Sequence, residues 1–457
     1  MCTIRSRVDR QLQRACGEFF DSFTKTETGF EVKSVAIKAV RGFKDILPSE
    51  APARVRIEDT ARQVFGRCGL KEIRTPVLEK TEVFKRGIGE HTDIVEKEMY
   101  TFQDRNGESL TLRPEATAGI VRAVVEHKLY GKSPLLKLFT MGPMFRHERP
   151  QKGRLRQFHQ INVEYIGSQE PAADAEIVWL AWEIVTSIAG SEDLLVEMNS
   201  LGCEKCRPLH RADLKVYLEN NKEDLCEDCQ RRMKVNPLRI FDCKNEECRR
   251  NLMLAPVMKH YLCPDCAGHL GLVLDILEAY GVPFVQNPYL VRGLDYYVRT
   301  TFEITSKRLG AQSTVAAGGR YDGLVKLMGG PDLPGVGMAV GVERLVLLME
   351  ESVPEKAIDL FIAALGRDAR DEAYYWIGYL RRQGISVEFS FEDKSLKAQM
   401  KQADKANARY CLIIGEQELE NEAAIFRDMN TKKQEEIDLD DLPEVLIEKI
   451  RNQKPGE

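Results

Sequence analysis

The chain reads Phe145-Arg146-His147-Glu148-Arg149-Pro150, then Gln151-Lys152-Gly153, then Arg154-Leu155-Arg156-Gln157-Phe158-His159-Gln160 at its most informative point. The apolar stretches on either side, 136–145 and 158–166, predict two strands joined by this basic loop. An extended backbone would place Arg146 and Glu148 on one face, because side chains two residues apart share a face. A guanidinium suits phosphate oxygens and a carboxylate accepts from an exocyclic amine, so the pair could grip a nucleotide. The plainer alternative is a hairpin with surface ion pairs.

The regions around this hairpin predict a sheet with helices beside it. Apolar residues at helical spacing predict one helix through 57–68, with Ser49 as its N-cap, and another through 177–188. Consecutive strand patterns with short loops favour an antiparallel sheet over a doubly wound one. The further predicted strands are 72–79, 98–103, 110–112, 289–294, 300–305 and 336–340.

The chain divides into four regions by composition and pattern. Residues 1–34 predict a loosely ordered extension. Acidic residues among its arginines argue against a mitochondrial transit peptide, and an upstream start-site artefact explains the segment at least as well as such an address. The β-rich region 35–352 is interrupted at about 201–270 by a helical, cysteine-rich insertion. Strands and helices alternate over 357–457, which is typical of a separate α/β domain. We therefore expect an α+β protein.

The composition excludes several classes of protein. With 457 residues, 43% of them hydrophobic and 30% charged, the chain can bury a large core and does not resemble a disordered or collagen-like sequence. It contains no apolar run long enough for a membrane span and no secretory signal, so we expect a cytoplasmic protein. The net charge of −5 conceals a local surplus, since 146–156 contains five basic residues against Glu148. That surplus could meet phosphates.

Two glycine-containing motifs fail on close inspection. Gly131-Lys132-Ser133 resembles the end of a phosphate-binding loop, but Glu126 stands where that motif needs glycine. The glycines of 335–341 have the wrong last interval for a dinucleotide fingerprint, and no early βαβ unit surrounds them.

Eight of the 12 cysteines fall in four closely spaced pairs. Three pairs have two intervening residues, the spacing that directs two thiolates at one tetrahedral metal ion, and four pairs could form two such sites. Structural zinc and reduced, metal-free cysteines both remain open. The candidate ligands are Cys203, Cys206, Cys226, Cys229, Cys243, Cys248, Cys263 and Cys266.

The hairpin resembles the second motif of class II aminoacyl-tRNA synthetases, a Phe-Arg-x-Glu strand, a loop and a returning strand. Residues 337–345 resemble the third motif of that class, and 48–78 resemble the first, which forms a dimer interface. Three longer motifs are similar to the histidyl-tRNA synthetase family in particular. They are Leu112-Arg113-Pro114-Glu115-Ala116-Thr117, Leu290-Val291-Arg292-Gly293-Leu294-Asp295-Tyr296-Tyr297 and Ala317-Gly318-Gly319-Arg320-Tyr321-Asp322.

The resemblance implies a class II catalytic core, an anticodon-binding domain at 357–457, and activation of L-histidine by ATP with Mg²⁺, followed by transfer to tRNA(His) in a homodimer. It implies catalytic roles for Arg146, Arg292 and Arg344, and ATP contacts from Arg146, Glu148, Phe158 and Arg344. Histidine would be bound by Glu115, Thr117, Gln160, Glu164, Tyr296 and Tyr297, and the tRNA acceptor end by Arg149 and Gln151. Leu155 departs from the family, where an aromatic residue is common.

A second function remains open from the same resemblance. The family has a catalytically silent relative that regulates histidine biosynthesis. Such a regulator typically lacks the anticodon-binding domain and loses active-site residues. This chain retains both, which favours the enzyme.

Overall fold

The computed structural model describes residues 23–26, 29–32, 37–89, 92–243, 245–294, 296–349 and 357–452. It divides the chain into two compact units, 1–352 and 353–457. Of the predicted extension, strands β1 (Phe23–Thr26) and β2 (Gly29–Val32) form an antiparallel hairpin, and the rest lies outside the described residues.

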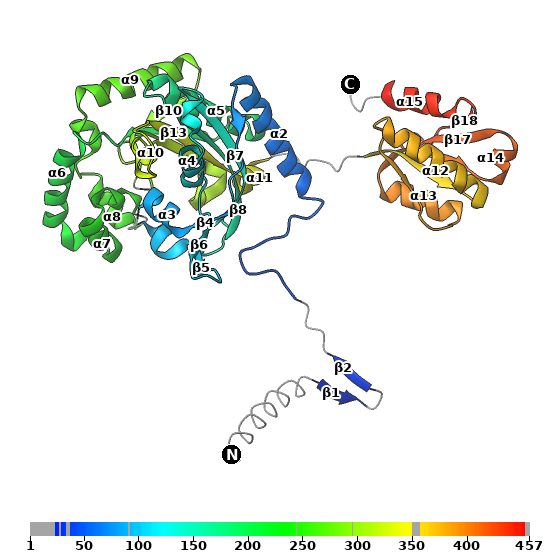
Figure 1. Cartoon of the computed structure of the whole chain (residues 1–457), viewed down its shortest axis with the longest axis horizontal. Helices are drawn as coiled ribbons and strands as arrows, with labels where there is room; N and C mark the ends of the chain where they lie inside the picture. The colour runs from blue at the N-terminus through cyan, green and yellow to red at the C-terminus, as the bar shows by residue number, and fades with distance from the viewer. Residues whose placement is uncertain are drawn as a thin grey trace. The chain divides into compact units, whose positions relative to one another are not determined.

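An eight-stranded sheet organises the large unit (Figure 1). Every pairing from β9 to β7 is antiparallel, which confirms the predicted sheet type, while the edge strands β10 and β3 pair in parallel. The strand order is β10 (Phe284–Gln286), β9 (Leu194–Ser200), β11 (Val298–Ser306), β12 (Thr314–Arg320), β13 (Gly335–Gly341), β8 (Gln157–Ile166), β7 (Leu136–Phe145) and β3 (Lys71–Glu72).

The two faces of this sheet differ in what they contact. Along β8, Ile161, Val163 and Tyr165 pack into the main core, which four helices complete. The alternate residues, among them Gln160 and Glu164, therefore point to the opposite face. That face carries the candidate site. The four helices are α2 (Ala51–Arg67), α5 (Pro171–Ala189), α9 (Pro264–Ala279) and α11 (Val342–Leu348).

Three local predictions were wrong. Glu50, not Ser49, precedes the first turn of α2, and no side chain caps that helix. Residues 72–79 do not form one strand, because the chain around Pro76 separates β3 from β4 (Leu78–Lys80). Residues 289–294 form no strand, and the Asn199 side chain donates to the carbonyls of Pro288 and Leu290.

A three-stranded sheet lies beside the main one and contacts helix α3, which packs against α4. Its order is β4, β6 (Ser109–Leu112) and β5 (Tyr100–Gln103). The helical elements around it are α3 (Thr81–Ile88), the π-helix η1 (Ile94–Glu98), α4 (Thr117–Glu126), the short helix η2 (Leu129–Gly131) and α10 (Leu324–Leu327). Another short helix, η6 (Lys307–Gln312), connects β11 to β12.

The cysteine-rich insertion is helical, as predicted, and has its own small core around Leu214 and Leu218. Helix α9, which follows it, packs with α5 in the main core. The insertion consists of α6 (Arg207–Asn220), η3 (Lys222–Asp224), α7 (Glu227–Val235), η4 (Pro237–Asp242), α8 (Glu246–Leu252) and η5 (Met258–Tyr261).

The C-terminal unit has the predicted alternation of strands and helices. Its sheet has the order β15-β14-β16-β17-β18, in which β15, β14 and β16 are parallel and β17 and β18 antiparallel. The elements are β14 (Ile358–Ala364), α12 (Arg367–Arg382), β15 (Val387–Phe389), α13 (Leu396–Lys405), β16 (Ala408–Ile414), α14 (Glu416–Glu420), β17 (Ala423–Asp428), β18 (Gln434–Asp438) and α15 (Leu442–Asn452). Across the described parts of both units, none of the helices has the length and apolar character needed to cross a bilayer.

Candidate active site

A pocket of about 310 Å³, called the arginine pocket below, opens on the sheet face opposite the main core. It contains four arginines against two glutamates, so its walls carry an excess of positive charge. Burial lowers the pKa of Arg146, Arg154 and Arg344, as expected for cations gathered away from water. The charged side chains that line it are Arg146, Glu148, Arg154, Arg292, Glu343 and Arg344.

The predicted hairpin supplies one wall of this pocket. Arg146 follows the last residue of β7, and its Nε donates to the Pro114 carbonyl at 2.9 Å. Its guanidinium carbon lies 5.5 Å from the centre of the Phe158 ring, which comes from β8. Glu148 lines the same pocket, but both of its carboxylate oxygens accept from Arg154. Arg146 and Glu148 therefore line the same pocket, and Glu148 is already paired with Arg154.

Arg292 lies in the loop before β11 and is fixed by Glu303. Burial alone would lower the pKa of Arg292, but the Glu303 carboxylate raises it, so the positive charge is secure. The other oxygen of Glu303 accepts from the Thr314 hydroxyl at 2.8 Å, and Arg344 donates to the Thr314 carbonyl. The short β11–β12 ladder thus positions two of the three predicted catalytic arginines.

A buried polar cluster lies beside the pocket, centred on Glu164. The Thr117 hydroxyl donates to one of its carboxyl oxygens and the Tyr321 hydroxyl to the other, each at 2.6 Å. Burial raises the pKa of Glu164 to about 8, against these two hydrogen bonds, which lower it. Glu115 caps the start of α4 by accepting from the amides of Thr117 and Ala118, at 2.7 and 2.9 Å, and burial raises its pKa too.

Gly337 makes room for this cluster. A Cβ at Gly337 would lie 1.9 Å from a carboxylate oxygen of Glu164, so a side chain there would displace the glutamate. The close approach of Glu164 therefore requires glycine at position 337.

The two predicted tyrosines lie between the pocket and the Glu164 cluster. The rings of Tyr296 and Tyr297 are 4.6 Å apart, and Tyr296 contacts the Tyr321 ring edge-on at 5.8 Å. Arg292 lies 5.7 Å from the Tyr297 ring, so the arginine pocket and the polar cluster are continuous. Burial raises the pKa of both tyrosines, and their hydroxyls stay protonated at neutral pH.

The structure does not bring every predicted residue into the site. Arg149 and Gln151 are exposed on the hairpin loop and do not line the pocket. Tyr321 lies within one of the family-like motifs, but no role was predicted for it, and Glu303 was not predicted at all. Glu343 also went unassigned. It accepts from Arg54 on α2 at 2.9 Å and from the His159 amide at 2.9 Å.

The cysteine pairs gather into two groups of four. Cys203, Cys206, Cys263 and Cys266 form the first cysteine cluster, and Cys226, Cys229, Cys243 and Cys248 form the second. Within each cluster all sulfur atoms lie within 4.8 Å of one another, and none of these cysteines is in a disulfide.

Comparisons with known proteins agree with this geometry. The family model for histidyl-tRNA synthetase matches residues 42–204 and 248–345, and the anticodon binding domain model matches 359–449. The chain is 55% identical to a histidine–tRNA ligase of Desulfosudis oleivorans, over 92% of this chain and 99% of that protein. It is 50% identical to that of Geobacter metallireducens, over 88% and 98%. Its structure resembles apo histidyl-tRNA synthetase of S. aureus with a TM-score of 0.76 at 35% identity, covering 90% of this chain and all of the other.

Proposed function

The chain belongs to the histidyl-tRNA synthetase family, and on that premise we propose that its arginine pocket binds ATP while the Glu164 cluster reads the histidine side chain. It is an aminoacyl-tRNA ligase with a catalytic domain and a separate anticodon-binding domain. One observation carries the assignment of the site. Arg292 lines the arginine pocket and lies over the Tyr297 ring, so one cation stands where the two substrates must meet.

The arginines supply what adenylate formation needs. The histidine carboxylate attacks the α-phosphate of ATP, an anion approaching an anion, so the reaction depends on alignment and fixed positive charge. Arg146 and Arg292 stand at the carboxylate and α-phosphate, and Arg344 at the γ-phosphate end. Phe158 offers its ring to adenine. Mg²⁺ bound to ATP would share the negative charge of the leaving diphosphate.

The polar cluster supplies selectivity for histidine. The Gln160 side-chain oxygen is buried and has no hydrogen-bond partner among the described residues, so it is available to the α-amine. Glu115 contributes negative charge to the same end of the amino acid. Glu164 and Tyr297 bond the two imidazole nitrogens, and Tyr296 closes the pocket. A wrong amino acid would leave these buried groups unpaired, which can give discrimination of about 10⁴ to 10⁵.

Transfer of histidine to tRNA uses parts of the chain outside this pocket. The unit at 353–457 binds the anticodon region. Arg149 and Gln151 contact the acceptor end, and their exposure on the hairpin loop suits contact with a large polyanion. A protein that charges tRNA is expected in the cytoplasm.

We further propose a homodimer formed through α2 and the adjoining edge of the main sheet. Strand β3 is an edge strand, and an unpaired edge favours association. Large apolar side chains on and around α2 are exposed, including Val55 at 55%, Leu47 at 56% and Val77 at 40%. Light scattering on the purified chain would show a dimer, and a monomer at micromolar concentration would contradict this.

The two cysteine clusters fit structural zinc. Four thiolates bound tetrahedrally at about 2.3 Å would place their sulfur atoms about 3.8 Å apart. The separation is 3.6 Å for Cys203 and Cys206 and 3.7 Å for Cys226 and Cys243. The metal would stabilise the insertion, because binding energy at such sites is also folding energy. Neither cluster lines the arginine pocket, so no step of adenylate formation uses it.

The site assignment is tested by histidine-dependent pyrophosphate exchange. We expect Arg146→Ala and Arg292→Ala each to slow exchange by roughly 100-fold or more, since losing one preorganised charge of this kind costs about 2.7 to 4 kcal/mol. Lys152→Ala, on the exposed loop, is the matched control and keeps wild-type exchange. Near-normal exchange in both arginine variants would reject the assignment.

A further inference from the structure

The first cysteine cluster marks the start of two helices. Cys206 directly precedes α6, and Cys263 directly precedes α9. Each helix carries, near its start, one side chain that forms hydrogen bonds in the direction of the proposed histidine site around Glu164 and Tyr297. The two side chains are Arg207 on α6 and His269 on α9.

Arg207 connects the insertion to the backbone of Tyr297. Its Nε donates to the Leu201 carbonyl at 3.1 Å, and a second guanidinium nitrogen donates to the Tyr297 carbonyl. Two backbone bonds close the same junction, from the Leu201 amide to the Arg299 carbonyl at 2.7 Å and from the Arg299 amide to the Gly202 carbonyl at 3.0 Å. The segment that carries Tyr297 is thus held from the insertion side.

The backbone at this junction needs such support. Arg299 has φ +48°, a left-handed conformation that side chains other than glycine rarely adopt. Such a conformation costs energy and persists only where surrounding contacts impose it. Arg207, through the Leu201 and Tyr297 carbonyls on either side of the junction, supplies those contacts.

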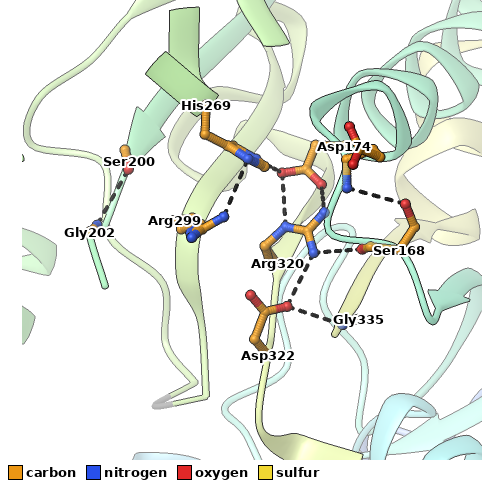
Figure 2. Close-up of polar contacts among 10 residues, drawn as sticks. Ser168, Asp174, Ser200, Gly202, His269, Arg299, Arg320, Asp322 and Gly335 are labelled. Atoms are coloured by element: carbon orange, nitrogen blue, oxygen red, sulfur yellow. Dashed lines mark hydrogen bonds and ion pairs between the residues drawn. The ribbon is translucent and has the colours of Figure 1, made fainter. Parts of the chain in front are cut away.

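His269 is linked to the end of β12 through a buried relay of side chains (Figure 2). Its Nε2 contacts Asp174 at 2.8 Å, and Asp174 pairs with Arg320 with no exposure of either charge. Arg320 also donates to the Ser168 carbonyl at 2.9 Å and to Asp322 at 3.1 Å. These bonds fix the end of β12, and the next residue along the chain is Tyr321.

We propose that Arg207 and His269 are positioning residues for histidine recognition. Arg207 sets the place of Tyr297, and His269 sets the place of Tyr321 and so of Glu164, to which the Tyr321 hydroxyl donates. Neither side chain lines the arginine pocket, so both act through residues that do the reading. The proposal rests on the proposed function, because it assigns these two residues to the imidazole end of the same site.

The test separates the two substrates. Arg207→Gln and His269→Leu, measured by pyrophosphate exchange, are expected to raise the Michaelis constant for histidine by about tenfold and to leave that for ATP within about twofold. Arg207→Lys and His269→Gln keep one donor each, and we expect them to recover part of the loss. Arg211→Gln, an exposed arginine one turn along α6, is the matched control and keeps both constants.

Thermal melting of each variant accompanies the kinetics, so that loss of fold is recognised. Equal rises for histidine and ATP, or unchanged constants in folded variants, would overturn the positioning roles. An absence of histidine-dependent exchange in the wild-type chain would instead refute the proposed function, so the two failures are distinguishable.

Discussion

Replacing Glu164 by glutamine tests the electrostatics of the proposed histidine site. Burial raises the pKa of Glu164 from 4.5 to about 8, so at neutral pH the folded protein holds this carboxyl protonated while the unfolded chain ionises it. Between those two values the native state binds more protons than the unfolded state. Stability therefore falls as pH rises through this window. The amide that the variant carries at this position cannot ionise, and its own contribution is independent of pH.

The magnitude follows from the two pKa values. The stabilisation supplied by neutral Glu164 falls by roughly 2 kcal/mol between about pH 6 and about pH 8. Glu164→Gln should therefore gain roughly that amount relative to wild type over the same interval. Because all other titrating groups are common to both proteins, the difference between the two isolates Glu164.

Urea unfolding followed by tryptophan fluorescence is a suitable assay. Two of the three tryptophans, Trp179 and Trp182, lie on α5 of the catalytic unit, and Trp376 lies on α12 of the other unit. A Trp376→Phe background makes the signal report on the catalytic unit alone. Protein concentration is held fixed, since association shifts apparent stability. A difference in the free energy of unfolding between variant and wild type that stays constant within about 0.5 kcal/mol across the interval would show that Glu164 is ionised in the folded protein.

Three other measurements test the roles proposed for Tyr297, the cysteine clusters and Arg149. Tyr297→Phe should raise the Michaelis constant for histidine far more than that for ATP, because one imidazole nitrogen loses its hydrogen-bond partner. A Michaelis constant for histidine within about twofold of the wild-type value would reject that role. Elemental analysis of protein purified without a metal-affinity tag should find about two zinc ions per chain, with Cys203→Ser lowering the melting temperature before the rate of adenylate formation; less than about a tenth of an equivalent would exclude zinc. Arg149→Ala should raise the Michaelis constant for tRNA and weaken its salt dependence while pyrophosphate exchange is unchanged, and a slowed exchange would place Arg149 at the ATP site instead.

The sequence predicted the fold where its signals are local. The hairpin around 145–160 and the other consecutive strand patterns joined by short loops predicted an antiparallel sheet, which the structure confirms. The strand prediction at 289–294 was wrong, and the sequence around that segment cannot show that the Asn199 side chain, far away in sequence, donates to the carbonyls of Pro288 and Leu290. Pro76 divided another predicted strand for a local reason that the sequence already contained.

The limits were similar at the site. Tyr321 stood in a quoted motif, but its role depends on the close approach of Glu164, which Gly337 permits across two neighbouring strands. The cysteine spacing identified four pairs without showing how they combine, since four pairs can form two sites in three ways. The structure selects one combination, with the outermost pairs together and the inner pairs together.

Pyrophosphate exchange measured with each of the common amino acids in turn tests the central claim most directly. Only the step that forms an aminoacyl adenylate gives exchange, so the assay reports the amino acid that the pocket activates without requiring tRNA. We expect pyrophosphate exchange into ATP with histidine alone. This exchange is expected to be abolished or severely slowed in Arg292→Ala. Exchange with another amino acid in preference to histidine, or no exchange with any of them by folded wild-type protein, would contradict it.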